Sequence, residues 1–145
     1  MKVFKHSIRM SLIFSILFLL ATIGLELIEG YKVTTTAYYG LKNIGVGFII
    51  PIYILCIIIY FITFFPLTIF INKYIRNKLI LRMIIYLLTS WLIGIWSFDK
   101  LYGHANGSFI KGYELNINNA IILYAMAGLV YSLFDYYLGR KINSK

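Results

Sequence analysis

The sequence has few acidic residues and a single cysteine, and both scarcities restrict what the protein can be. Its 145 residues contain five Asp and Glu against fourteen Lys and Arg, which gives a formal net charge of +9. The lone Cys56 excludes an internal disulfide and any dithiol redox pair. We expect it to serve as a small apolar side chain within a helix.

Clustered metal ligands and catalytic motifs are also missing. His6 and His104 lie far apart with no second His or Cys beside either, so we predict no metal site and no cofactor. A set made of His104, Asp99 and Glu114 is the less favoured alternative. There is no Gly-rich phosphate loop, no nucleophile elbow and no zincin helix. We therefore predict no catalytic residues and expect a protein that is not an enzyme.

Charge is absent from four long stretches of the chain. No charged side chain occurs between Arg9 and Glu26, Lys42 and Lys73, Arg82 and Asp99, or Glu114 and Asp135. Hydrophobic residues make up 61% of the sequence, against roughly 45–50% in ordinary globular proteins. These runs predict an all-α integral membrane protein, a bundle of four transmembrane helices that forms one domain over residues 1–145. The spans are expected at about 8–28, 44–71, 79–98 and 117–138.

The basic residues are distributed unevenly over the connections between these spans. Ten of the fourteen lie at the N-terminus, the second connection and the C-terminus, and the other four are Lys32, Lys42, Lys100 and Lys111. By the positive-inside rule, both termini are predicted to be cytoplasmic, with the bacterial plasma membrane as the expected location. Because the charge is dispersed at span ends instead of forming a basic stripe, we expect no nucleic-acid partner.

Each predicted span carries small or polar side chains along one face. At 100° per residue these residues fall within a narrow arc, roughly 60° on the first span. On the first span they are Ser11, Ser15, Thr22, Glu26 and Glu29, and on the fourth Tyr124, Gly128, Tyr131 and Asp135. Packing these faces together predicts a partly polar interior. Close helix packing with hydroxyl hydrogen bonds is favoured over a hydrated path or ligand cavity.

Four ionisable residues are the candidate intramembrane polar or ion-pair residues, since charges in a membrane are costly and often functional. They are Glu26, Glu29, Arg82 and Asp135. For Glu26 and Glu29, the favoured interpretation places both in the outer headgroup region, paired with lysines. The alternative is a carboxylate pair that holds one proton or a cation. Arg82 and Asp135 each lie about one turn inside the inner interface, which suggests a structural ion pair.

A resemblance to a known family rests on two hydrophobic stretches. The first is Phe65-Pro66-Leu67-Thr68-Ile69-Phe70-Ile71-Asn72-Lys73, and the second is Leu133-Phe134-Asp135-Tyr136. Both resemble segments of an uncharacterised family of small four-span membrane proteins of Bacillus-type bacteria. The resemblance covers about the second half of the chain. It implies a four-helix integral membrane protein, without a known activity or any transferable functional residue.

Three classes of function follow from these observations. The favoured one is a non-enzymatic membrane protein that acts through protein contacts, such as an immunity or accessory protein. The second is a small oligomeric transporter or channel subunit, although Glu26 lies close to the interface for a transport carboxylate. The third is a membrane enzyme of lipid chemistry. The expected partners are the lipid bilayer and either further copies of the chain or another membrane protein.

Overall fold

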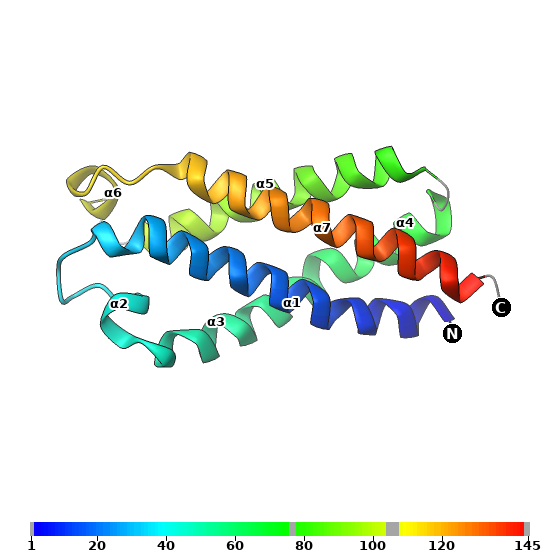
Figure 1. Ribbon diagram of the computed structural model, residues 1–145, viewed down its shortest axis with the longest axis horizontal. Helices are drawn as coiled ribbons and strands as arrows, with labels where there is room; N and C mark the ends of the chain where they lie inside the picture. Colours follow the sequence, from blue (N-terminus) through cyan, green and yellow to red (C-terminus); the bar gives the residue numbers. More distant parts are fainter. Residues whose placement is uncertain (1, 76–77, 104–107, 144–145) are drawn as a thin grey trace.

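The chain folds into a bundle of long helices in a computed structural model that describes residues 2–75, 78–103 and 108–143 (Figure 1). The first span is α1 (Lys2–Ile28), the third α5 (Leu79–Tyr102) and the fourth α7 (Ile117–Asn143). The second span combines α3 (Val46–Ile59), a π-helical turn η2 (Tyr60–Phe64) and α4 (Phe65–Tyr74). All four are long and apolar enough to cross a membrane, and no strand occurs in the described ranges. The predicted all-α fold is confirmed.

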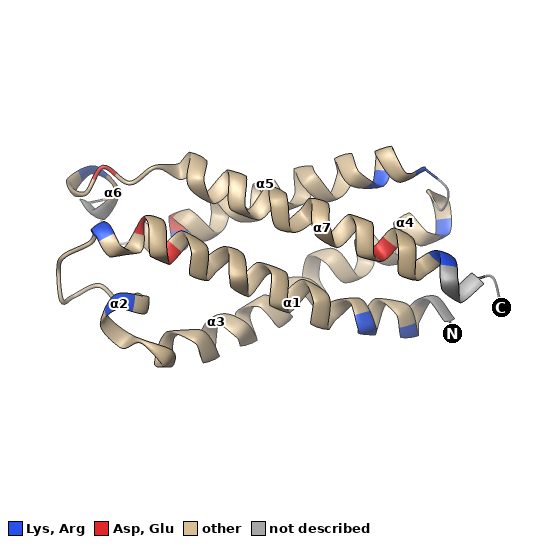
Figure 2. Cartoon of the chain, viewed as in Figure 1, with Lys and Arg blue, Asp and Glu red and all other residues tan. Residues whose placement is uncertain are grey.

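The two ends of the bundle differ in what they carry. Both termini and the connection from α4 to α5 lie at one end, which we call the terminal end (Figure 1). The opposite end, the loop end, carries three short helices: η1 (Gly30–Lys32), α2 (Leu41–Ile44) and α6 (Ser108–Gly112). Charged residues gather at these two ends and leave the middle of the bundle uncharged (Figure 2).

The helices pack in the order α5, α7, α1 and then α3 with α4. The closest approach joins α5 to α7, where a Cβ added at Gly128 would overlap the Ser90 hydroxyl. Gly94 on α5 also lies close to α7, because a Cβ there would be 3.1 Å from the Ala120 carbonyl oxygen. Small residues thus let two backbones meet, which is the packing that the sequence favours.

The second span leaves regular α geometry just before Pro66. Proline has no N–H and its ring clashes with the carbonyl four residues earlier, so the wider π turn at η2 accommodates it. Pro51 lies within α3, and the helix continues through it. The last span also differs from the prediction, because α7 runs past Gly139 to Asn143. Gly139 packs instead of ending the helix: a Cβ there would lie 3.2 Å from Asn72 Oδ1.

Apolar side chains face outward and polar ones inward. Along α1, Ile8, Leu12, Ile16 and Leu20 recur every four residues and are exposed, as expected of a helix face solvated by lipid. The polar stripes predicted on α1 and α7 are buried, except that Ser11 is half-buried. The bundle therefore places its hydroxyl, carboxylate and guanidinium groups where they must find partners within the protein.

Candidate functional site

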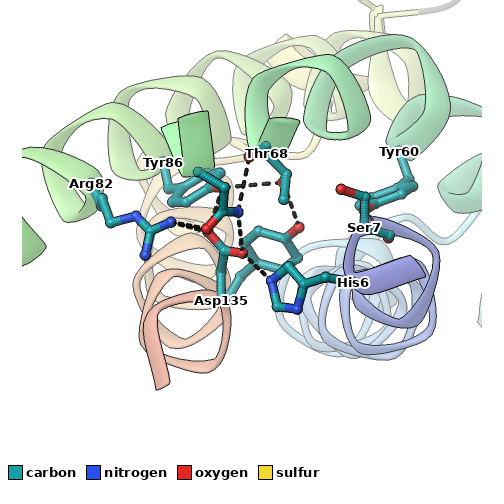
Figure 3. Close-up of polar contacts among 9 residues, drawn as sticks. His6, Ser7, Tyr60, Thr68, Arg82, Tyr86 and Asp135 are labelled. Carbon is teal, nitrogen blue, oxygen red and sulfur yellow. Dashed lines mark hydrogen bonds and ion pairs between the residues drawn. The ribbon is translucent and has the colours of Figure 1, made fainter. Parts of the chain in front are cut away.

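Asp135 joins all four spans at the terminal end (Figure 3). Its carboxylate, on α7, is fully buried. His6 Nε2 on α1 lies 2.7 Å from Oδ1, and Asn72 on α4 donates to the same oxygen at 3.1 Å. Tyr86 on α5 donates to Oδ2 at 2.8 Å. One carboxylate thus holds donors from three other spans, so it fixes their relative positions.

Arg82 completes this terminal cluster, which we define as Asp135, His6, Asn72, Tyr86 and Arg82. Its Nη2 lies 3.3 Å from Asp135 Oδ2, within ion-pair distance, and it also donates to Asn72 Oδ1. The guanidinium is buried, with its carbon 5.7 Å from the ring centre of Tyr136. The two residues proposed from sequence as an ion pair therefore lie together, within a larger network.

Thr68 and Tyr131 continue the polar network into the bundle. Their hydroxyls lie 2.9 Å apart, and Thr68 is also 3.1 Å from the Tyr86 hydroxyl. Further toward the loop end, the core becomes aromatic. Phe14 stacks on Phe18 with ring centroids 3.9 Å apart, and the ring centroids of Phe64 and Tyr131 are 5.0 Å apart. These rings separate the terminal cluster from the polar groups at the loop end.

Glu26 is the centre of a second site, at the loop end. It is 1% exposed and accepts a hydrogen bond from Tyr102 of α5 at 2.8 Å. The Tyr38 hydroxyl and the Leu41 backbone N–H, both from the first connection, also donate to it. Burial and the hydrogen bond to Glu26 raise the pKa of the Tyr38 hydroxyl above its ordinary value. A Cβ added at Gly40 would overlap the Glu26 carboxylate, so a glycine makes room for it there.

Glu29 is held by a different set of donors. Lys32 Nζ lies 2.8 Å from its carboxylate, and the Asn116 backbone N–H donates at 3.0 Å. The Asn119 side chain also donates, so Glu29 attaches the end of α1 to the beginning of α7. Glu29 is fully buried.

The interpretation favoured from sequence paired both acids with lysines at headgroup level. Both carboxylates are buried within the protein, because the first connection and α7 supply donors at this end. Glu29 has its lysine, whereas Glu26 has tyrosine partners and no lysine within the described part of the chain. The two carboxylates bind separate donors, which does not match a pair that shares one proton.

A small cavity lies between the Glu26 site and the aromatic core. It has a volume of about 170 Å³, and Thr22, Ser97, Tyr124 and Cys56 contribute to its wall. The Thr22 and Tyr124 hydroxyls bond each other at 2.6 Å. The cavity wall is therefore mixed in character, with hydroxyl groups as well as aromatic and aliphatic side chains.

No three His, Cys, Asp or Glu side chains come together as a metal-binding group in residues 2–75, 78–103 and 108–143. His104 lies outside the described residues, so its combination with Asp99 and Glu114 is not placed.

Sequence reasoning missed several donors in both sites. His6 precedes the predicted first span, which begins at about residue 8, but it lies in α1 and is buried. A signal was present, because His6, Met10, Phe14 and Phe18 form one buried row at four-residue spacing. Tyr86 had a similar signal, because Arg82, Tyr86 and Ser90 form a buried row at four-residue spacing on α5. Tyr38 had no such signal, since its place depends on how a connection folds.

Comparison with known proteins matches this chain to no family model, no curated protein and no solved structure.

Proposed function

We propose that this chain is a non-enzymatic, multi-pass membrane protein that acts through contacts with another membrane protein, as immunity and accessory proteins do. The observation that supports this most is the way in which its buried carboxylates are used. Asp135 has four partners from three other spans, and Glu26 has three donors. Groups engaged in this way hold helices in place.

A transport carboxylate has a different requirement. It must exchange its proton or ion with water on each side of the membrane, and so it needs partners that can be released and a path to solvent. Asp135 and Glu26 are separated by the packed rings of Phe14, Phe18 and Phe64. This arrangement favours a fixed bundle whose activity resides on its outer surface.

We further propose that the terminal end faces the cytoplasm of the bacterial cell. The support is the positive-inside rule, because ten basic residues belong to the termini and the second connection. The family resemblance also remains a proposal. Its two stretches, Phe65–Lys73 and Leu133–Tyr136, contribute Asn72 and Asp135 to the same terminal cluster.

A small oligomeric transporter or channel subunit is the second candidate, and the cavity of about 170 Å³ favours it. Thr22, Ser97 and Tyr124 offer hydroxyls there to a polar solute. This candidate requires the aromatic core to open, and it predicts protein-dependent flux across a vesicle membrane.

The proposed contact function is tested by photo-crosslinking in intact cells of the source organism. A benzophenone amino acid is placed at one exposed position on each helix: Leu12, Ile54, Leu88 or Met126. We expect ultraviolet light to produce a discrete adduct with a second membrane protein from one helix face, with the other positions as controls. The contact function is contradicted if all four positions give adducts only with lipid.

A further inference from the structure

A groove runs between the second span, α3 with η2, and α5; α3 packs on α1, and α5 packs on α7. Its volume is about 510 Å³ and its walls are apolar, with Ile58 and Ile62 on one side and Leu92 on the other. Thr63 and Thr89 are the lining residues nearest the terminal end of the bundle. The groove adjoins the internal cavity, because Leu55, Ile59, Ile93 and Trp96 contribute to both. The groove and the cavity together form one hollow, which extends from the lipid-facing side of the bundle inward.

The size of the groove restricts its occupant. One turn of an α-helix about 10 Å wide and 5.4 Å high fills roughly 420 Å³. A groove of about 510 Å³ therefore encloses little more than the volume of a single turn, so a transmembrane helix could insert only one row of side chains into it. A slender, flexible chain fits the same space and continues into the adjoining cavity.

The depth of the hollow matches one leaflet of a bilayer. Thr89 lines the groove and Lys100 lines the cavity, eleven residues further along α5. At 1.5 Å per residue these positions are about 16 Å apart along the helix. The hydrocarbon core of a bilayer is about 30 Å thick, so this distance is close to half of it. A chain that enters at Lys100 therefore ends near the midplane.

Lys100 supplies a positive charge where the hollow lies nearest the loop end of the bundle. It is exposed, and within the described ranges no carboxylate lies at ion-pair distance from it. Lys32 at the same end is already paired with Glu29. Asp99 is the residue before Lys100 on α5, so its side chain points about 100° away around the helix and faces a different direction. The ammonium of Lys100 is thus available to an anionic group at headgroup level.

We propose that this hollow binds one phospholipid of the loop-end leaflet, with an acyl chain in the groove and the phosphate at Lys100. The apolar walls match the chain, the depth matches one leaflet and the lysine matches the phosphate. This inference concerns the α3–α5 face and holds whether or not the protein acts through a protein partner.

The test is native mass spectrometry of the full chain in detergent, titrated with palmitoyl-oleoyl phosphatidylglycerol. We expect the wild type to retain one lipid. Lys100→Gln should weaken retention about fivefold, the factor expected for one cation near a lipid surface. Leu92→Trp should weaken retention, because the indole occupies part of the space that the acyl chain would fill. The matched controls Lys111→Gln and Leu88→Trp lie outside the hollow and should bind as the wild type does.

Three results would overturn the proposal. If Lys100→Gln and Lys111→Gln retain the lipid equally, the phosphate does not bind at Lys100. Equal retention by Leu92→Trp and Leu88→Trp means that only annular lipid is bound. A crosslink from Leu92 to a protein would make the occupant a partner instead. Should Leu92→Trp fail to fold, Ile58→Trp narrows the groove from its opposite wall and distinguishes the same outcomes.

Discussion

Replacing Asp135 with Asn is expected to destabilise the bundle strongly, because one carboxylate contacts every other span. The substitution keeps the size of the side chain and removes its charge. Arg82, which is 1% exposed, is then left as a buried cation without a counter-charge. The contacts to His6, Asn72 and Tyr86 also weaken, because an amide replaces the carboxylate that accepts from them.

The magnitude follows from these contacts. Interhelical hydrogen bonds in membrane proteins average about 0.6 kcal/mol, so three of them account for roughly 2 kcal/mol. Removing one partner of a buried ion pair costs about 3–5 kcal/mol. The charge therefore dominates, and we expect Asp135→Asn to lower the free energy of unfolding by about 3–5 kcal/mol. The double variant with Arg82→Gln should lose less than the single variant, because the unpaired cation is gone.

Cys56 provides the assay. It is the only cysteine in the chain and it is buried, so a thiol-reactive fluorophore reports unfolding during a titration with sodium dodecyl sulfate. The exposed Asp99→Asn is the matched control, for which we expect a change within about 0.5 kcal/mol. If Asp135→Asn unfolds at the same detergent fraction as Asp99→Asn, the carboxylate does not hold the four spans together.

Two further predictions use the same assay. Gly128→Ala should destabilise the α5–α7 contact, since its Cβ overlaps Ser90, and Ser90→Gly in the same chain should restore much of the loss. Gly24→Ala is the control, because a Cβ there lies 3.6 Å from its nearest neighbour and helix propensity favours Ala by about 0.5–1 kcal/mol. Tyr102→Phe removes a donor to Glu26 and should cost about 1–2 kcal/mol. The exposed Tyr39→Phe should change nothing, and equal effects of the two would contradict the assigned hydrogen bond.

The sequence predicts the spans well because a membrane penalises charge so strongly. Long runs without Lys, Arg, Asp or Glu leave little freedom in where a helix crosses. Helical periodicity also predicts that Tyr131 and Asp135 face inward, and both are buried. Arg82 and Asp135 could be brought together by depth alone, since each lies one turn inside the same end.

The partners of the buried acids were harder to predict. Glu26 is buried because the first connection folds back and delivers Tyr38 and the Leu41 N–H, which no periodic pattern describes. His6 was missed because α1 begins before its apolar run does. Gly139 is an ambiguous signal, since glycine is common both after helix ends and where helices pack closely.

The most direct test of the central claim, that the buried carboxylates hold the bundle together and do not carry protons, is proton flux in vesicles. Purified protein is reconstituted into liposomes that contain a pH-sensitive dye, and the decay of an imposed pH gradient is recorded. Glu26→Gln is compared with the exposed control Glu114→Gln, after both have been shown to fold by the Cys56 assay. We predict that the wild type and both variants decay at the rate of empty liposomes. Faster decay in the wild type that Glu26→Gln abolishes and Glu114→Gln preserves would contradict the account.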